Sequence, residues 1–543
     1  MFLVRKPYGF GTENIKGDCL EQIYLIPSER KMTSHAENTK RIAKNTLMLY
    51  IRMFFSMLVS LYTSRVVLNT LGVEDYGIYN VVGGVVGMLG VLTASLGGAS
   101  SRYITFDLGK KDIAILKKTF GNIKCIHFLL TILIFILGET VGLWFMVTQL
   151  HIPIERQGAA LYVYQFSIFS AMLSIISAPY TSVVIAHEKM SVFAYISMTD
   201  VVLKLVAVYF LTIISYDKLI IYAFCYLLIQ LFDTVTYYIY SVRTFEESKA
   251  RMGYDKKLFK EIFAYSGWVL NGNLAVMGYT QGLNMLLNVF FGPVVNAARG
   301  IAVSVQTICC GFCNNFQTAL NPQITKNYAQ GNMSYVHSLL VKSSKFSLYI
   351  LFIVILPLMF ETMTVLKLWL GNVPDHTVVF LRIMLCISLF TALSNPVIIA
   401  VHATGKLRRF QLIEGNMLLL IVPIAYIVLK FFHLPPESVF IVHLCIELCT
   451  QYVRLKIVLP MIKMDLNTYW LQVVAPILRV LILSPILPFI LYCLIKTDFL
   501  RFFVVCIACV VSCLFFIYTI GCSRSEKDFI AGKIAVYIPK IKQ

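Results

Sequence analysis

Apolar segments of bilayer length recur along almost the whole of this 543-residue chain, and they limit the fold more than any other feature. Hydrophobic residues make up 58% of the sequence and charged residues only 14%, with a mean hydropathy of +0.75. Such a composition excludes a soluble globular protein. A helix needs about 20 apolar residues to cross the hydrocarbon core of a membrane. We therefore predict an all-α polytopic membrane protein.

The runs are continuously apolar, whereas a membrane β-barrel alternates apolar and polar residues over about ten positions. Helices are therefore required. We expect about fourteen transmembrane helices, at residues 45–68, 76–98, 123–146, 159–186, 190–214, 218–241, 262–288, 294–319, 345–369, 378–402, 411–431, 438–459, 471–495 and 500–520.

The formal net charge of +19 is unevenly distributed between the predicted loops. Loops 102–124 and 242–261 and the tail after residue 520 are rich in Lys and Arg, whereas loops 71–76 and 371–377 contain neither. Cytoplasmic loops carry the excess of basic residues in membrane proteins. We therefore expect both termini in the cytoplasm and an even number of spans. Topology and anionic lipid account for the charge, so nucleic-acid binding is not expected.

Residues 1–44 form a polar cytoplasmic segment in this prediction. They lack an apolar core followed by a small-residue cleavage site, so they are not a signal peptide. Met32 precedes a basic stretch and is an alternative start, so we expect residues 1–31 to be dispensable for insertion and transport.

Most of the fourteen cysteines fall inside predicted spans, among apolar neighbours. Cysteine in such surroundings behaves as a small buried apolar residue. Metal binding would need converging thiolates and a polar second shell. We expect no metal site and no cofactor.

Short motifs recur at a nearly constant offset. Leu71-Gly72-Val73 returns as Phe291-Gly292-Pro293, 220 positions later, and Ser177-Ala178-Pro179 returns as Ser394-Asn395-Pro396 after 217. An offset of six spans preserves direction across the membrane, so the halves are parallel repeats. Secondary transporters use such repeats around a central cavity. The predicted segments are a bundle of six helices at 45–241, a cytoplasmic linker at 242–261, a second bundle at 262–459, two additional helices at 460–520 and a cytoplasmic tail at 521–543.

Two stretches carry a family resemblance. The segment from Arg65 to Asn80, which contains Leu-Gly-Val-Glu-Asp-Tyr-Gly, resembles the first periplasmic turn of polysaccharide repeat-unit (O-antigen, Wzx-type) flippases. Asn296-Ala-Ala-Arg-Gly300, followed by Leu320-Asn-Pro-Gln-Ile-Thr325, resembles the eighth-span signature of the same group. The group belongs to the multidrug, oligosaccharidyl-lipid and polysaccharide exporter superfamily. The resemblance covers roughly residues 40–460.

The resemblance implies export of an undecaprenyl-diphosphate-linked oligosaccharide across the bacterial cytoplasmic membrane by alternating access, for surface polysaccharide biosynthesis. The implied partners are the lipid-linked oligosaccharide, membrane lipids, and the glycan polymerase and glycosyltransferases of the same pathway. A peptidoglycan-precursor flippase stays open as a related alternative.

Basic residues inside the spans are candidates for binding a diphosphate. A charge at a helix centre costs about 2.5–3.5 kcal/mol, so it must face a cavity or a partner. Arg52 is about two turns inside its span, and Arg299 lies in a stretch of small residues. A guanidinium can bind two phosphate oxygens at once. For both residues a structural interhelical pair is the alternative. The predicted cations of the cavity are Arg299, Arg52, Arg65 and Lys204.

Acidic residues inside the spans are candidates for ion coupling. Asp200 lies four positions before Lys204, so both share a helix face and can neutralise each other. Glu139 and Glu361 occupy equivalent positions in the two repeats, which indicates either a role in the fold or ion coupling. H⁺ and Na⁺ both stay open as the coupling ion.

Two other functions compete with this prediction. An ion-coupled multidrug extruder has the same architecture, but the basic bias of the intramembrane charges disfavours it. A membrane glycan polymerase or glycosyltransferase normally needs a sizeable periplasmic loop, and every predicted outer loop is short. The sequence contains no paired-carboxylate, Ser-His-Asp or metal-ligand pattern, so we expect no enzyme.

Overall fold

The computed structural model describes residues 18–87, 90–149, 152–528 and 531, and over these residues the protein is entirely helical. The helices are α1 (Asp18–Gly87), α2 (Gly90–Lys110), α3 (Ile113–Leu137), η1 (Gly138–Gly142), α4 (Leu143–Gln149), η2 (Ile154–Arg156), α5 (Gln157–Ala186), α6 (Met190–Ile213), α7 (Lys218–Thr244), η3 (Glu247–Lys249), α8 (Lys256–Ala329), α9 (Met333–Phe360), α10 (Thr362–Leu370), α11 (Thr377–Thr404), α12 (Arg408–Leu419), α13 (Ile421–Phe432), α14 (Ser438–Met461), α15 (Leu466–Tyr469), η4 (Trp470–Val474), α16 (Ala475–Leu483), α17 (Ile486–Leu494), α18 (Asp498–Phe516) and η5 (Ile517–Gly521).

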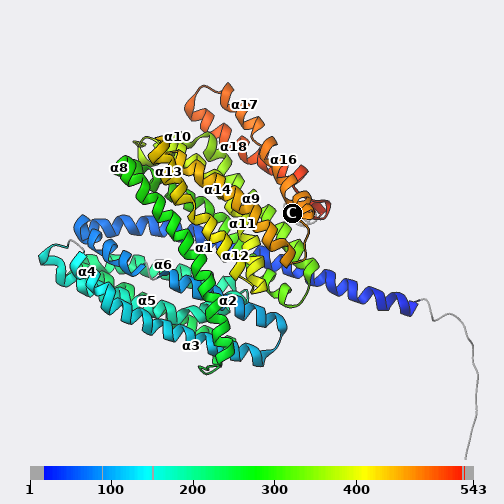
Figure 1. Cartoon of the computed structure of the whole chain (residues 1–543), viewed down its shortest axis with the longest axis horizontal. Helices are drawn as coiled ribbons and strands as arrows, with labels where there is room; N and C mark the ends of the chain where they lie inside the picture. Colours follow the sequence, from blue (N-terminus) through cyan, green and yellow to red (C-terminus); the bar gives the residue numbers. More distant parts are fainter. Residues whose placement is uncertain (1–17, 88–89, 150–151, 529–530, 532–543) are drawn as a thin grey trace, which may run out of the picture.

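The helices form two halves, which Figure 1 shows side by side. Helices α1–α7 make the first half, in blue to cyan, and α8–α14 make the second, in green to orange. The first turns of α1 project beyond the bundle. Residues 1–17 of the predicted N-terminal segment lie outside the described residues, and 18–44 belong to α1.

Twelve segments among the described residues are long and apolar enough to cross a membrane. They are Arg41–Ser60, Ile113–Thr148, Ile154–Ala186, Met190–Ile213, Lys218–Thr244, Val294–Ala329, Met333–Phe360, Thr377–Thr404, Arg408–Phe432, Ser438–Met461, Leu466–Leu494 and Asp498–Gly521. The predicted spans at 76–98 and 262–288 fall on α1–α2 and on the first part of α8, and neither is among the twelve. The all-helical membrane fold is thus observed, and the count of fourteen stays a prediction.

Single glycines divide the two longest helices. Gly72 interrupts α1 and Gly292 interrupts α8, with φ angles of 81° and 80° and ψ angles of 170° and −175°. This backbone conformation is open almost exclusively to glycine. The two kinks lie 220 residues apart, in agreement with the sequence repeat. Pro179 in α5 and Pro396 in α11 form a second matched pair.

The two additional helical segments pack on the second half. Figure 1 shows α16–α18 along its outer edge. Lys345 of α9 forms a buried ion pair with Glu526 at 2.8 Å, and the Tyr469 hydroxyl donates to Ser344 Oγ of α9 at 3.3 Å. These contacts attach the C-terminal region to α9.

Ion pairs show which helix ends lie together. Arg41 and Lys326 meet at Glu188, whereas Asp75 and Asp217 meet at Arg156. Successive helices therefore alternate in direction, and the molecule has two ends. We call the end with the 111–112, 187–189, 245–255 and 405–407 connections the basic end. The end with Gly72, Arg156 and Asp217 is the far end.

Candidate functional site

A polar cavity of about 330 Å³ lies inside the second half. Helices α8, α11 and α12 supply its amide side chains, among them Asn314, Gln317 and Asn395, and α14 supplies charged side chains. Asn273 of α8, which also lines it, donates to Ser95 Oγ of α2 at 2.8 Å and so links the cavity wall to the first half. Many hydrogen-bonding groups therefore face one enclosed space.

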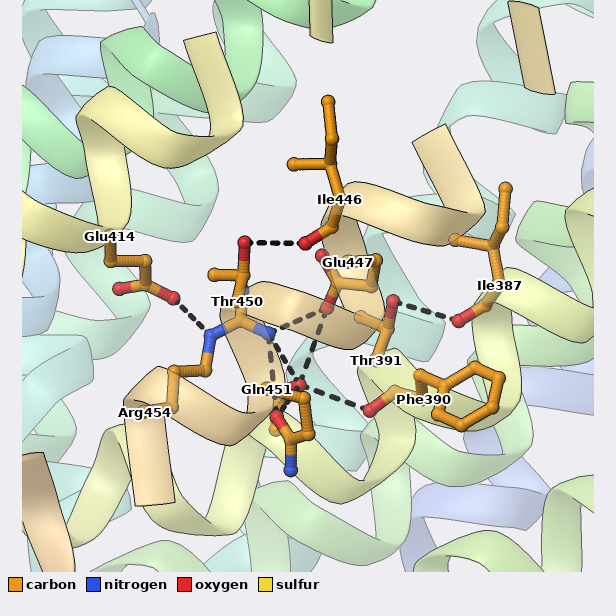
Figure 2. Close-up of polar contacts among 10 residues, drawn as sticks. Ile387, Phe390, Thr391, Glu414, Ile446, Glu447, Thr450, Gln451 and Arg454 are labelled. Carbon is orange, nitrogen blue, oxygen red and sulfur yellow. Dashed lines mark hydrogen bonds and ion pairs between the residues drawn. The ribbon is translucent and has the colours of Figure 1, made fainter. Parts of the chain in front are cut away.

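Arg454 holds two carboxylates at the wall of this cavity, as Figure 2 shows. Its Nε donates to Glu414 Oε1 at 2.5 Å and its Nη1 to Glu447 Oε1 at 2.6 Å. Nη1 also donates to Ser394 Oγ at 2.8 Å. All three charged side chains are at least nine-tenths buried. With both carboxylates ionised, this second-half cluster carries one net negative charge.

Helix geometry explains how the second-half cluster assembles. Glu447 and Arg454 are seven positions apart on α14, which places them two turns apart on one face. Glu414 comes from α12, which packs beside α14. Sequence reasoning missed Arg454. The i, i+7 spacing of opposite charges in an apolar helix is the signal that would have found it.

The first half holds its own charge cluster on α6 and α7. Lys204 donates to Asp200 Oδ2 at 2.8 Å, and its ammonium lies 5.4 Å from the centre of the Tyr226 ring. Asp233 of α7 lies close enough to Asp200 and Lys204 to interact with both electrostatically. This first-half cluster is more accessible, because the Lys204 side chain is 33% exposed.

Arg52 lies in the seam between the two halves. From α1 it donates to Asn315 Oδ1 of α8 at 2.9 Å, and its guanidinium lies 4.9 Å from the centre of the Phe193 ring on α6. Its Nε is buried with no hydrogen-bond partner among the described atoms. Arg52 also interacts electrostatically with Tyr237, as do Asp200 and Asp233, so these charges share one neighbourhood.

Arg299 connects the two arms of α8 on either side of the Gly292 kink. It donates to the Thr280 carbonyl at 2.9 Å and to Asn284 Oδ1 at 3.1 Å. Arg299 is buried, with 9% of its surface exposed. The hydrogen-bond partners found for it among the described residues are both on α8, and neither is Arg52. The side chain of Arg65, the fourth predicted cation, lies outside the described residues.

The two repeat-related glutamates make different contacts. Glu139 accepts a hydrogen bond from Gln165 Nε2 at 3.1 Å. Glu361 is almost fully buried, accepts from Thr364 at 2.6 Å and forms an ion pair with Arg501 of α18 at 2.9 Å. The ion pair between Glu361 and Arg501 attaches α18 to the second half.

Among the contacts that join the halves at the basic end, two are related by the repeat. Glu188, between α5 and α6, accepts from Gln323 at 2.7 Å and from Lys326 at 3.3 Å, both on α8. Arg102 of α2 donates to the carbonyls of His402 and Ala403, at the end of α11, at 3.1 and 3.0 Å. Sequence reasoning predicted neither. The two contacts are related by the repeat, since α2 and α8, and the 187–189 and 405–407 turns, are equivalent.

At the far end, the ion pairs of the described residues instead lie within each half. Arg156 pairs with Asp217 at 2.6 Å, and His376 pairs with Glu437 at 2.5 Å, with both partners 220 positions further on. Burial raises the pKa of Asp217, but hydrogen bonds from Arg156 and from two backbone N–H groups outweigh burial and leave it below its ordinary value. Among the described residues, the ion pairs that join the two halves therefore lie at the basic end.

Comparison with known proteins places the chain in a family. The family described as Polysaccharide biosynthesis protein matches residues 42–363, which is more than half of the chain. The protein belongs to the polysaccharide biosynthesis protein family. A search of curated protein sequences finds no match.

Solved structures show the same fold at low sequence identity. A structure described as MATE in the straight conformation aligns with a TM-score of 0.67 and 15% identity, over 78% of this chain and 96% of the other. A transporter of the MOP superfamily from Pyrococcus furiosus aligns with a TM-score of 0.66 and 14% identity, over the same shares. An outward-facing multidrug resistance MATE transporter of the MOP superfamily aligns with a TM-score of 0.63 and 15% identity, again over 78% and 96%.

These matches confirm the expected superfamily fold and a multi-pass membrane protein. The polysaccharide biosynthesis family on this fold is not an enzyme family, which confirms that expectation as well.

Proposed function

We propose that the protein is a flippase that moves an undecaprenyl-diphosphate-linked oligosaccharide across the bacterial cytoplasmic membrane, with its basic end and both termini in the cytoplasm. The family match over residues 42–363 is the observation that carries the proposal. The fold supports it, because matching solved structures are MOP-superfamily transporters. Polysaccharide units are built on lipid carriers, and a transporter of this family is suited to carry such a unit.

Arg52 is our first candidate for contact with the diphosphate. It lies in the seam between the halves, and its Nε has no partner among the described atoms. A guanidinium with a free donor can bind a phosphate oxygen without breaking an existing pair. Arg299, Arg65 and Lys204 stay candidates. Arg299 also has a buried Nε without a partner among the described atoms, but both of its terminal nitrogens donate to acceptors on its own helix, whereas Arg52 lies between the halves.

The first-half cluster is our candidate for proton coupling. The carboxyl groups of Asp200 and Asp233 lie close enough for their negative charges to repel, which favours a proton on one of them. Loss of that proton would leave two aspartates to compete for Lys204. H⁺ is therefore favoured over Na⁺ as the coupling ion. Glu361 is a weaker candidate because it is held by Arg501 and Thr364. Glu139 stays a candidate, since one of its carboxylate oxygens is buried without a partner among the described atoms.

A deletion strain tests the proposed function. It should lose surface polysaccharide and accumulate the lipid-linked unit on the cytoplasmic side, and the wild-type gene should restore both. Arg52→Ala should fail to restore export at normal membrane abundance, while Arg243→Ala, at an exposed position, serves as the matched control. Normal surface polysaccharide with altered drug sensitivity would instead identify a multidrug extruder.

A further inference from the structure

A large cavity at the basic end belongs to none of the sites described above. It has a volume of about 1190 Å³ and lies between the start of α8, the start of α12 and the end of α14. From the first half, only Tyr103 is among its lining residues within the described chain. Its floor includes Trp268 of α8.

Four basic residues line this basic-end cavity: Lys406, Arg408, Arg409 and Lys456. None of them forms an ion pair with a carboxylate in the described residues, and Glu261 is the only acid in the lining. The Glu261 carboxylate accepts a hydrogen bond from the Tyr103 hydroxyl at 3.2 Å. The cavity therefore has a surplus of three positive charges, and no group of the described chain neutralises them.

The remaining walls are apolar. They include Leu412 and Ile413 of α12, and Ile457, Pro460 and Met461 of α14. Leu412 is 39% exposed, and Phe263, on the neighbouring surface of α8, is 61% exposed. Exposed apolar side chains on a membrane protein face lipid chains. The cavity thus joins a lipid-facing surface to a cluster of cations at one membrane boundary.

We propose that this cavity binds the phosphate headgroup of an anionic phospholipid from the leaflet at the basic end. Arg408 and Arg409 supply forked donors to a phosphodiester, Lys456 adds a point charge, and the apolar walls accept the upper part of an acyl chain. Basic pockets between helices at this depth suit anionic headgroups. The Arg408 guanidinium is already oriented, 5.9 Å from the centre of the Trp268 ring.

A phosphate on the lipid carrier of the transported unit would have the same chemistry. The phospholipid is favoured because it is present in the leaflet in large excess, and occupancy follows concentration. A bound headgroup would contact Tyr103 of the first half as well as the cations of the second. It would therefore stabilise the conformation in which the basic end is closed.

Thermal unfolding of the purified full-length protein in detergent tests the site. Dioleoyl phosphatidylglycerol should raise the midpoint by about 2–4 °C at saturation, and dioleoyl phosphatidylcholine should not. The triple variant Arg408→Gln, Arg409→Gln, Lys456→Gln should lose the shift. These side chains are exposed, so the variant should fold; native mass spectrometry that counts bound lipid provides a second readout.

A charge-matched control removes two Arg and one Lys elsewhere at the basic end: Arg243→Gln, Arg251→Gln, Lys463→Gln. It should retain the response to phosphatidylglycerol. An unchanged shift or unchanged lipid count in the Arg408, Arg409, Lys456 variant would overturn the proposal. Stabilisation by undecaprenyl phosphate with none by phosphatidylglycerol would also overturn it and would assign the cavity to the carrier lipid. Neither result depends on whether the protein is a flippase.

Discussion

The two halves place similar charges between equivalent helices, but the charges differ in their exposure and in their pairing. The first-half cluster joins Asp200, Lys204 and Asp233, and the second-half cluster joins Glu414, Glu447 and Arg454. Each contains two acids and one base. In the second half the base is 5% exposed and bonded to both acids, whereas Lys204 is 33% exposed and bonded to one. A sealed, paired cluster is suited to hold helices together, and an accessible, incompletely paired one to exchange a proton.

The largest expected effect is on the second-half cluster. Arg454→Ala leaves two buried carboxylates without their partner, and such a loss costs about 3–5 kcal/mol. We expect little folded protein in the membrane. Lys204→Ala removes an i, i+4 pair that is worth only about 0.3–0.5 kcal/mol, so its abundance should be near normal. Membrane abundance and thermal unfolding of both variants measure the difference.

A charge-neutral control sharpens this first comparison. Glu414→Gln and Glu447→Gln combined with Arg454→Met keep the volume and remove all three charges, so much of the stability should return. If Arg454→Ala and Lys204→Ala were equally abundant, the contrast between the halves would be wrong.

The next effect separates Arg299 from Arg52. Arg299→Ala leaves the Thr280 carbonyl without the guanidinium, at a cost of about 1–3 kcal/mol, so the variant should be less abundant. Arg52→Ala should be abundant and inactive in export. Arg299→Lys should restore abundance only in part, because Lys lacks the fork that reaches both acceptors. Quantification of membrane protein beside surface glycan measures both.

If the Arg299→Ala protein is abundant but cannot export, the result would support substrate binding by Arg299. An abundant Arg299→Ala protein with normal export would exclude it from both roles.

The contact of Glu188 with α8 should control which end is open. Glu188→Ala removes the acceptor of Gln323 and Lys326, so the closed basic end should become less populated. Spin labels on the two halves at the basic end should report longer distances in this variant. Asp107→Ala, a buried acid at the same end whose hydroxyl partner Thr119 lies in its own half, is the control. Unchanged distances would mean that the Arg102 contact is sufficient.

The smallest expected effect concerns pH at the far end. Because the folded pKa of Asp217 is lowered, its pairing stabilises the protein above the unfolded pKa of about 3.9, and this stabilisation is lost as pH falls through the folded value. Asp217→Asn should lower stability near pH 7 by about 0.2–1 kcal/mol and flatten the acid limb of the unfolding curve. Midpoints measured from pH 7 to pH 3 provide the check. A parallel downward shift at every pH would show that the charge of Asp217 is not the cause.

Much of the fold follows from local sequence patterns. Apolar run length predicts the helices, and the offset of 220 predicts the matched kinks at Gly72 and Gly292. The i, i+4 spacing predicts that Asp200 and Lys204 can pair, and they lie 2.8 Å apart. Each of these relations lies within one helix or follows from the repeat itself.

Contacts between distant helices could not be predicted in this way. Arg454 binds Glu414 from another helix, 40 positions away, and Glu188 binds Lys326 across 138 positions. Hydropathy predicts which residues form helices, but it does not predict how each helix is rotated or which helices pack beside it. Side-chain partners on different helices therefore stay unknown. The same limit applied to Arg299. Whether it binds substrate or forms a structural pair depends on which groups surround its side chain, and hydropathy does not give those groups.

The kinks at Gly72 and Gly292 also have a practical consequence for epitope tagging and proteolysis. At each kink one residue, and not a loop, connects two long helical arms. A protease has no extended segment to cleave there, and an inserted tag would break the turn that only glycine accepts. Tags for tracking the far end belong instead in the non-helical stretches at 371–376 and 433–437, where the chain leaves its helices.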